Sequence, residues 1–141
     1  MEINSNLLKA FLPSSTDVNR SKYIPFLNKY MPMYGIRTDK QIAAFFAQIG
    51  HESAHLNYSK EIASGAAYEG RKDLGNIYPG DGVKFKGRGL IQITGRTNYE
   101  KAAKALGIYC VNHPELLEQP EWAVKSACWW WANAGLNNIA G

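Results

Sequence analysis

Glu52 and Glu61 are the residues of this sequence whose type and spacing best fit catalysis. Two carboxyl groups that face each other across a cleft can hydrolyse a glycosidic bond. One carboxyl, kept protonated by apolar surroundings, donates its proton to the leaving oxygen, while the other, in its ionised form, activates water. Twelve acidic residues in 141 make a gap of nine positions unremarkable, so spacing alone leaves a pair of surface glutamates as the alternative.

The helix that must position Glu52 is the best defined in the sequence. Thr38 can cap its first turn, and Gln41 can return the hydrogen bond to complete a capping box. Its apolar residues follow the i, i+3, i+4, i+7 spacing of one buried stripe: Ile42, Phe45, Phe46 and Ile49. Continued by the same step, the stripe reaches Glu52, where the pattern calls for an apolar residue. This anomaly favours a functional role for Glu52.

His51 and His55 flank Glu52 and define a rival chemistry. The stretch HESAH, residues 51–55, fits the HExxH pattern in which two histidines one helical turn apart bind zinc and the glutamate acts as base. The third histidine, His113, is distant in the sequence, the flanking residues do not resemble a protease, and the helix is expected to end here. We therefore favour the saccharide chemistry and expect no metal site.

Residues 64–89 lack hydrophobic periodicity and hold seven of the thirteen glycines. A stretch of this length without regular structure is uncommon in a compact domain and tends to be functional. Glu69 is a third acidic candidate within it. We expect Glu69 to hold the loop through a salt bridge to Arg71 or Arg88 rather than to perform catalysis.

Residues 87–99, GRGLIQITGRTNY, combine glycines that let the backbone approach a ligand with side-chain amides and hydroxyls. Neutral donors and acceptors of this kind match sugar hydroxyl groups. A phosphate-binding loop is the alternative, but the order of glycines and lysines fits neither the P-loop nor the dinucleotide fingerprint. Short strands at 84–85 and 90–93 would form at most a small β-hairpin beside this segment.

Two further helices frame the region. Apolar spacing predicts a helix over 17–34, with Pro25 as a point of interruption, and another over 121–134, closed by Gly135. The second carries all four tryptophans, which could stack on sugar rings, although we expect at least two of them to belong to the core. They are Trp122, Trp129, Trp130 and Trp131.

A third helix is expected over 98–106. Thr97 and Glu100 have the spacing of a second capping box, and Gly107 is placed to end the helix. With no internal repeat and no linker, the chain is expected to be one domain.

Composition supports one globular domain and limits the partners. The 141 residues are 45% hydrophobic and 20% charged, which excludes a disordered or fibrous chain. A formal net charge of +4 suits a polyanionic partner. Zinc-finger spacing, a basic zipper region and RNP-type strands are all missing, so nucleic-acid binding is not expected.

Cysteine content and hydropathy indicate the cellular compartment in which the protein is expected. Cys110 and Cys128 are too few for a disulfide framework, and buried thiols are preferred over a single disulfide. The first residues lack the pattern of a signal peptide, and no apolar run approaches the ~20 residues that cross a bilayer. We expect a cytoplasmic monomer that is not inserted in a membrane and reaches a cell wall only after release.

Four separated motifs, taken together, resemble the family 19 glycoside hydrolases. They are residues 43–53 (AAFFAQIGHES), 68–76 (YEGRKDLGN), 79–82 (PGDG) and 87–99. The likeness spans roughly residues 38–138 in the right order, and it is strongest to the short lysozyme-like branch of phage endolysins and bacterial lytic enzymes. Four motifs in register are far more specific than one, which further lowers the weight of the zinc alternative.

The resemblance implies a mainly α, lysozyme-like α+β fold with a small β-hairpin and a glycine-rich loop beside the cleft. It also implies inverting cleavage of a β-1,4 bond between amino sugars without a cofactor, with Glu52 as general acid and Glu61 as general base. Inversion requires carboxyls roughly 6.5–9.5 Å apart, which leaves room for water between them.

The same resemblance assigns the residues around the carboxylates. Thr94 would help to hold the attacking water, and Gln92 and Asn98 would bind sugar. Tyr68, Glu69 and Arg88 complete the set of candidate substrate- or water-binding residues.

Two features depart from the family pattern. The common Gly-Gly after the His-Glu-Ser stretch is Ala54–His55 here, so the turn toward Glu61 is expected to differ. Family members usually continue past the tryptophan helix into an Asn-Gly-rich segment with an arginine near the carboxylates. We therefore expect a single domain over 1–141 that lacks the family's C-terminal segment.

The sequence thus predicts an endolysin-type glycoside hydrolase that binds and cleaves peptidoglycan or a chitin-like polysaccharide. Three alternatives remain open. They are a small chitinase, a lytic transglycosylase in which one glutamate performs both proton transfers, and a non-catalytic cell-wall-binding domain.

Overall fold

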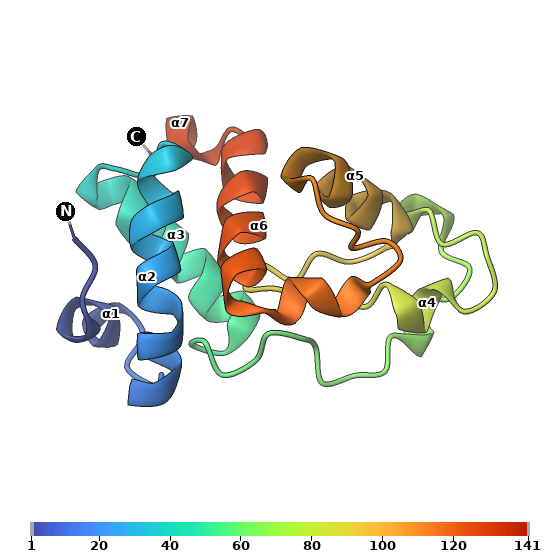
Figure 1. Ribbon diagram of the computed structural model, residues 1–141, viewed down its shortest axis with the longest axis horizontal. Helices are drawn as coiled ribbons and strands as arrows, with labels where there is room; N and C mark the ends of the chain where they lie inside the picture. The colour runs from blue at the N-terminus through green and yellow to red at the C-terminus, as the bar shows by residue number, and fades with distance from the viewer. Residues whose placement is uncertain (1, 141) are drawn as a thin grey trace.

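A computed structural model describes residues 2–140 and shows a mainly helical chain (Figure 1). Five helices gather in one part of the molecule: α1 (Ser5–Phe11), α2 (Asp17–Met33), α3 (Asp39–Ser53), α6 (Pro120–Asn133) and α7 (Leu136–Ala140). The other part consists of long loops and short helices: η1 (Ala66–Tyr68), η2 (Lys72–Leu74), α4 (Asp81–Lys84), α5 (Arg96–Leu106) and η3 (Pro114–Glu118).

Helix α3 forms where the sequence predicts it. The Thr38 side chain accepts a hydrogen bond from the Gln41 N–H at 3.1 Å, and the Gln41 side chain accepts one from the Thr38 N–H at 3.0 Å. This capping box satisfies two amide groups that the first turn would otherwise leave unpaired. The predicted stripe is buried in the core, and the helix ends at Ser53, directly after Glu52.

Helix α2 runs through Pro25 without ending there, so the predicted interruption does not occur. A proline inside a helix removes one N–H donor and disturbs the carbonyl one turn earlier. Pro25 lies on the exposed side, where water can bind that carbonyl, while the opposite side buries Tyr23 and Leu27.

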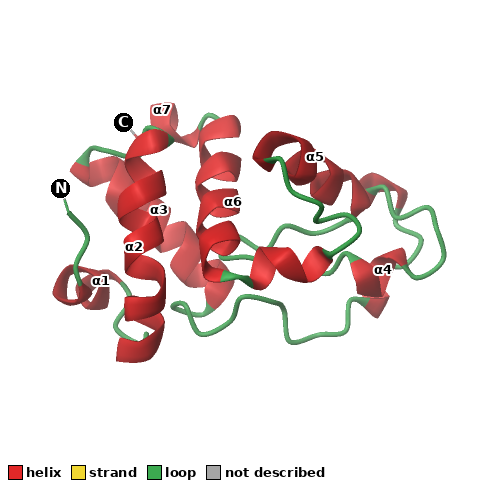
Figure 2. Cartoon of the chain, in the orientation of Figure 1, coloured by secondary structure: helices red, strands yellow, loops and turns green. Residues whose placement is uncertain are grey.

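The predicted β-hairpin is wrong. Residues 2–140 contain two isolated antiparallel bridges, Lys60 with Arg88 and Arg88 with Ile93, and no strand, as the absence of yellow in Figure 2 shows. Lys84 closes helix α4 instead. Residues 89–92 form a turn, in which Gln92 adopts a left-handed φ of 58°.

The second predicted capping box is also wrong. Helix α5 begins at Arg96 with Gly95 as its N-cap, so Thr97 already lies inside the first turn. The reason is tertiary: Gly95 has a φ of 92°, and a methyl group there would lie 2.7 Å from the Leu74 carbonyl oxygen. The predicted end at Gly107 is confirmed by its left-handed φ of 68°.

An ion pair between Arg96 and Asp81 joins the glycine-rich segment to α5. Both Arg96 Nε and Nη2 lie 2.8 Å from the carboxylate oxygens, and Asp81 is only 2% exposed. The arginine holds the pKa of Asp81 below its usual range. The loop is therefore fixed by a charge-assisted contact rather than by backbone regularity.

The core contacts all four tryptophans but buries only one. Trp131 is 5% exposed and packs edge-on against Phe45, with ring centroids 5.6 Å apart. Trp122, Trp129 and Trp130 are partly buried and pack against this core, in line with the expectation that at least two of the rings belong to it. Cys110 and Cys128 are buried free thiols, as predicted.

The length and hydropathy of the helices indicate whether any of them could cross a membrane. Among residues 2–140, none of the helices combines the length and the apolar character that crossing a bilayer would require.

Candidate active site

A cleft of about 290 Å³ lies where the end of α3, the α6–α7 corner and residues 91–98 meet. Glu52 is half-buried in its wall. The other lining residues are Gln48, Leu74, Ile91, Gln92, Ile93, Thr94, Asn98, Trp130 and Leu136. Three of the predicted site residues, Gln92, Thr94 and Asn98, therefore share the cleft with Glu52.

Glu52 has both polar and apolar neighbours. Its Oε1 accepts a hydrogen bond of 3.1 Å from the Gln48 side chain, one turn earlier on α3. The aliphatic and aromatic residues of the lining make much of the surrounding wall apolar. The Glu52 carboxyl is therefore held at the cleft wall, where a ligand in the cleft could receive its proton.

Gln92, Thr94 and Asn98 form a polar wall of the cleft. Hydrogen bonds within this segment fix the orientation of the three side chains. Thr94 Oγ1 donates to the Gln92 carbonyl, and the Asn98 amide donates to the Thr94 carbonyl, both at 2.9 Å. The Gln92 amide donates to the Gly89 carbonyl at 2.9 Å. Gln92 also holds a left-handed backbone, a strained state that residues other than glycine adopt mainly where the surroundings enforce it. The side chains are thus preset for a polar ligand.

Glu61 is not among the residues that line the cleft, and its carboxylate is held by Gly87 and Tyr68. Its Oε1 accepts a hydrogen bond of 2.6 Å from the Gly87 N–H, and its Oε2 accepts one of 3.1 Å from the Tyr68 hydroxyl. A methyl group at Gly87 would lie 2.7 Å from Gln92 Oε1 and 3.3 Å from Thr94 Oγ1. Gly87 therefore contacts the Glu61 carboxylate and lies next to those two side chains.

Tyr68 contacts the Glu61 carboxylate directly and is not among the residues that line the cleft. Burial first, and then the Glu61 carboxylate, raise the pKa of Tyr68. The phenol accordingly keeps its proton over the ordinary pH range and remains a donor to Glu61.

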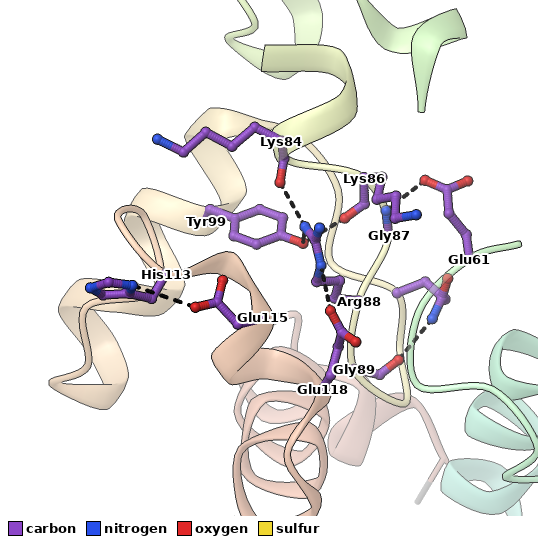
Figure 3. Close-up of polar contacts among 11 residues, drawn as sticks. Glu61, Lys84, Lys86, Gly87, Arg88, Gly89, Tyr99, His113, Glu115 and Glu118 are labelled. Carbon is purple, nitrogen blue, oxygen red and sulfur yellow. Dashed lines mark hydrogen bonds and ion pairs between the residues drawn. The ribbon is translucent and has the colours of Figure 1, made fainter. Parts of the chain in front are cut away.

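Arg88 is not among the cleft-lining residues, and its guanidinium lies next to Tyr99 and Glu118 (Figure 3). Its Nε lies 2.9 Å from Glu118 Oε2, and its Nη1 donates to the Lys84 carbonyl at 2.6 Å and to the Tyr99 hydroxyl at 3.1 Å. Only 12% of the side chain is exposed. The structure therefore gives Arg88 internal partners in place of the predicted contact with ligand.

Glu69 holds the glycine-rich loop, but not through the predicted salt bridge. Its two carboxylate oxygens accept hydrogen bonds from the Gly80 N–H at 2.9 Å and from the Gly82 N–H at 2.8 Å. Arg71 pairs with Asp73 instead, at 2.6 Å. The backbone amides at the start of α4 are satisfied by Glu69, which makes this residue an anchor for the loop.

The HExxH arrangement does not form. Helix α3 ends at Ser53, and Ala54, His55 and Leu56 all have a positive φ, so His55 leaves the helix before it could stand one turn from His51. His55 Nδ1 instead accepts a hydrogen bond of 3.1 Å from the Ser14 N–H. Among residues 2–140, no cluster of three or more histidine, cysteine or acidic side chains could hold a metal.

Gln48, Leu74 and Leu136 are cleft residues that the sequence analysis did not find. Gln48 could have been inferred, since it precedes Glu52 by one helical turn. Leu74 and Leu136 could not, because they reach the cleft from η2 and α7 through tertiary packing alone.

This architecture, helices and long loops around one cleft with a glutamate at a helix end, is of the lysozyme-like type. A sequence profile described as "Chitinase class I" matches residues 33–139. The chain therefore belongs to family 19 of the glycoside hydrolases, as the four motifs predict.

Plant chitinases are among the relatives. Endochitinase EP3 of Arabidopsis thaliana is 38% identical over 96 residues, which cover 67% of this chain and 35% of that protein. Chitinase 4 of Oryza sativa subsp. japonica is 34% identical over 117 residues, covering 77% and 41%. The chain thus spans between about a third and two fifths of these relatives.

Solved structures of the same family have the same fold. A bacterial family 19 chitinase superimposes with a TM-score of 0.71 at 26% identity, covering 93% of this chain and 68% of that one. Chitinase C from Streptomyces griseus gives 0.71 at 27% identity, covering 92% and 54%. These proteins are chitinases, so the endolysin branch stays a prediction.

Proposed function

We propose that this chain hydrolyses β-1,4 bonds between amino sugars in a chitin-like polysaccharide, with inversion at the anomeric carbon. The observation that carries the proposal is the unlike setting of two glutamates, one in the cleft lining and one bound to Gly87, which lies next to Gln92 and Thr94 of that lining. Glu52 lines a partly apolar cleft, whereas Glu61 receives two hydrogen bonds. Membership of family 19 supports the same chemistry.

In this proposal Glu52 is the general acid. A saccharide in the cleft places its glycosidic oxygen next to the Glu52 carboxyl, which gives up its proton as the bond to the anomeric carbon breaks. The hydrogen bond from Gln48 fixes the rotamer of the acid. The amides of Gln92 and Asn98 hold sugar hydroxyls, so the bond to be cut is aligned before proton transfer.

Glu61 is the general base. The Gly87 N–H and the Tyr68 hydroxyl donate to its two carboxylate oxygens and hold the side chain in one orientation. A water held by Thr94 attacks the anomeric carbon from the face opposite the leaving oxygen, and its proton passes to Glu61. One bond forms, one breaks, and the two glutamates end with their protonation states exchanged.

The stereochemistry of the first product tests this mechanism. With a soluble chitin oligosaccharide and the full chain, proton NMR at early times should show the α-anomer before mutarotation. Glu52→Gln should abolish cleavage with the fold intact by circular dichroism, since glutamine has no proton to donate. Appearance of the β-anomer first would contradict inversion, and cleavage by Glu52→Gln would contradict the assignment of the acid.

Peptidoglycan is the second candidate substrate, and the formal net charge of +4 favours it, because many cell-wall polymers are anionic. We propose it as the finer alternative, consistent with an endolysin role. Mass spectrometry after parallel digestion of purified peptidoglycan and chitin separates the two. New reducing ends from peptidoglycan alone would favour the endolysin, and 1,6-anhydro ends would identify a transglycosylase. Binding without cleavage of either polymer would identify a wall-binding domain.

A further inference from the structure

One peptide bond connects the Glu61 carboxylate to a buried charge network on its other side (Figure 3). The Lys86–Gly87 peptide offers its N–H to Glu61 Oε1 at 2.6 Å. The carbonyl of the same peptide, on Lys86, accepts a hydrogen bond of 2.5 Å from the Tyr99 hydroxyl. Tyr99 and Glu61 therefore bind opposite ends of a single dipole.

The Tyr99 hydroxyl is itself polarised by a cation. Arg88 Nη1 donates to the hydroxyl oxygen at 3.1 Å, and the guanidinium is held by Glu118 at 2.9 Å and by the Lys84 carbonyl at 2.6 Å. Each donor in this row points toward Glu61. Hydrogen bonds in such a row strengthen one another, because each polarises the next.

The centre of the row is shielded from water, whereas Arg88 and Glu118 at its far end are 12% and 26% exposed. Tyr99 is fully buried, and its ring packs against Phe85 with centroids 5.0 Å apart. Burial raises the pKa of Tyr99, so its hydroxyl keeps the proton that it donates to Lys86. A buried row in a low-dielectric interior acts more strongly on its terminal acceptor than a solvated one.

We propose that Tyr99 and Arg88 are positioning residues that act on the Glu61 carboxylate through the Lys86–Gly87 peptide. The inference rests on the proposed function, because Glu61 matters as a base only if the chain is a hydrolase. In this arrangement Arg88 and Tyr99 strengthen the Gly87 N–H as a donor and fix its direction. They thereby favour the ionised base without touching substrate.

Tyr99→Phe tests the relay with the least disturbance, since it removes one hydroxyl and keeps the ring against Phe85. Tyr30→Phe is the matched control, because Tyr30 is also a buried tyrosine, 4% exposed, whose hydroxyl donates to a different carboxylate, that of Glu121, at 2.7 Å. Both variants lose one buried hydroxyl. Only the first should act on Glu61.

The first readout does not need activity. Weakening of the Gly87 hydrogen bond moves its amide proton upfield in the NMR spectrum of Tyr99→Phe but not of Tyr30→Phe. Arg88→Met should reproduce the shift, and Arg88→Lys, which keeps a cation beside the hydroxyl, should restore part of it. An unchanged Gly87 amide proton in folded Tyr99→Phe would overturn the relay.

The second readout is the pH dependence of kcat/KM on a soluble chitin oligosaccharide. The acidic limb, which reports the base, should move to higher pH in Tyr99→Phe, with about a two- to fourfold loss on that limb from the lost cooperative strengthening and an unchanged plateau. A fall of the plateau without movement of the limb would mean a merely structural role and would overturn the proposal. If the unmodified chain cleaves no saccharide, the proposed function fails, while the Gly87 amide proton still decides whether the relay exists.

Discussion

Glu61 and Gly87 exchange two hydrogen bonds that run in opposite directions. The Glu61 N–H donates to the Gly87 carbonyl at 2.8 Å, and the Gly87 N–H donates to the Glu61 carboxylate at 2.6 Å. The candidate base is thus fixed at its backbone and at its side chain by one residue. Because that residue also lies against Gln92 and Thr94, a small change at Gly87 reaches both parts of the site.

Gly87→Ala should therefore damage the site more than the fold. The new methyl group would lie 2.7 Å from Gln92 Oε1 and 3.3 Å from Thr94 Oγ1, which forces the polar wall to move. Misplacement of catalytic groups by about 1 Å can cost about a hundredfold, so we expect kcat/KM on chitin oligosaccharides to fall at least tenfold. Steady-state kinetics and thermal unfolding measure the two effects.

Gly107→Ala provides the comparison for that substitution. Unlike Gly87, Gly107 has no atom within 4 Å of a new methyl group, but its left-handed φ of 68° makes alanine strained. We expect a loss of about 1 kcal/mol in the free energy of unfolding and normal kcat/KM. Equal kinetic loss in the two variants would show that the effect of Gly87→Ala is not local.

The Asn137 side chain should determine how α7 packs at the edge of the cleft. Its side chain accepts from Trp131 Nε1 at 2.7 Å and donates to the Tyr34 carbonyl at 2.9 Å, which docks α7 and places Leu136 in the cleft lining. Asn137→Ala removes both bonds, at a cost of about 2 kcal/mol of stability. We expect KM to rise several-fold with little change in kcat.

The neighbouring Asn138, which is exposed, supplies the control for Asn137. Asn138→Ala should leave stability and KM unchanged. If Asn137→Ala lowered kcat and left KM as it was, the proposed role of α7 as a binding wall would be wrong.

Local sequence signals predicted the elements that depend on local chemistry. The capping box of Thr38 and Gln41 and the apolar stripe of α3 act within one or two turns, so the sequence reveals both the helix and the anomalous place of Glu52. The same reasoning located the end of α5 at Gly107, because only that residue carries the left-handed cap.

Features set by distant contacts escaped prediction. The start of α5 depends on Gly95 packing against Leu74, and the place of Arg88 depends on Glu118, thirty positions later. The nearness of Glu61 to the cleft wall comes from Gly87, which spacing between the two glutamates cannot reveal. The family resemblance supplied the pairing of Glu52 with Glu61, since the residues by themselves left it open.

Ala54→Gly should stabilise the protein. Ala54 caps α3 with a φ of 51°, in the left-handed region that costs a residue with a β-carbon roughly 1–2 kcal/mol. Glycine removes this strain but has a more flexible unfolded chain, so we expect a net gain of about 0.5–1 kcal/mol in the free energy of unfolding. Denaturant titration measures it.

Ala47→Gly is the matched control, because Ala47 is an exposed residue in the interior of the same helix. There the same substitution should destabilise the protein by about 1 kcal/mol. Opposite signs at the two positions would establish that strain at the cap, rather than helix propensity, determines the effect. A loss of stability in both variants would refute it.

Asp81 and Arg96 should make stability depend on acidity. Because Arg96 lowers the pKa of Asp81 in the folded protein, the pair stabilises the fold above the ordinary carboxyl pKa of about 3.9. That contribution is lost as the pH falls through the lower, folded value. Asp81→Asn leaves a partly buried arginine without its charged partner, so we expect a loss of about 3 kcal/mol at neutral pH. Urea titrations of both proteins from pH 7 to about pH 2 should show this difference in the free energy of unfolding shrinking below about pH 4. A difference that stays constant over the whole range would mean that it does not arise from the ion pair.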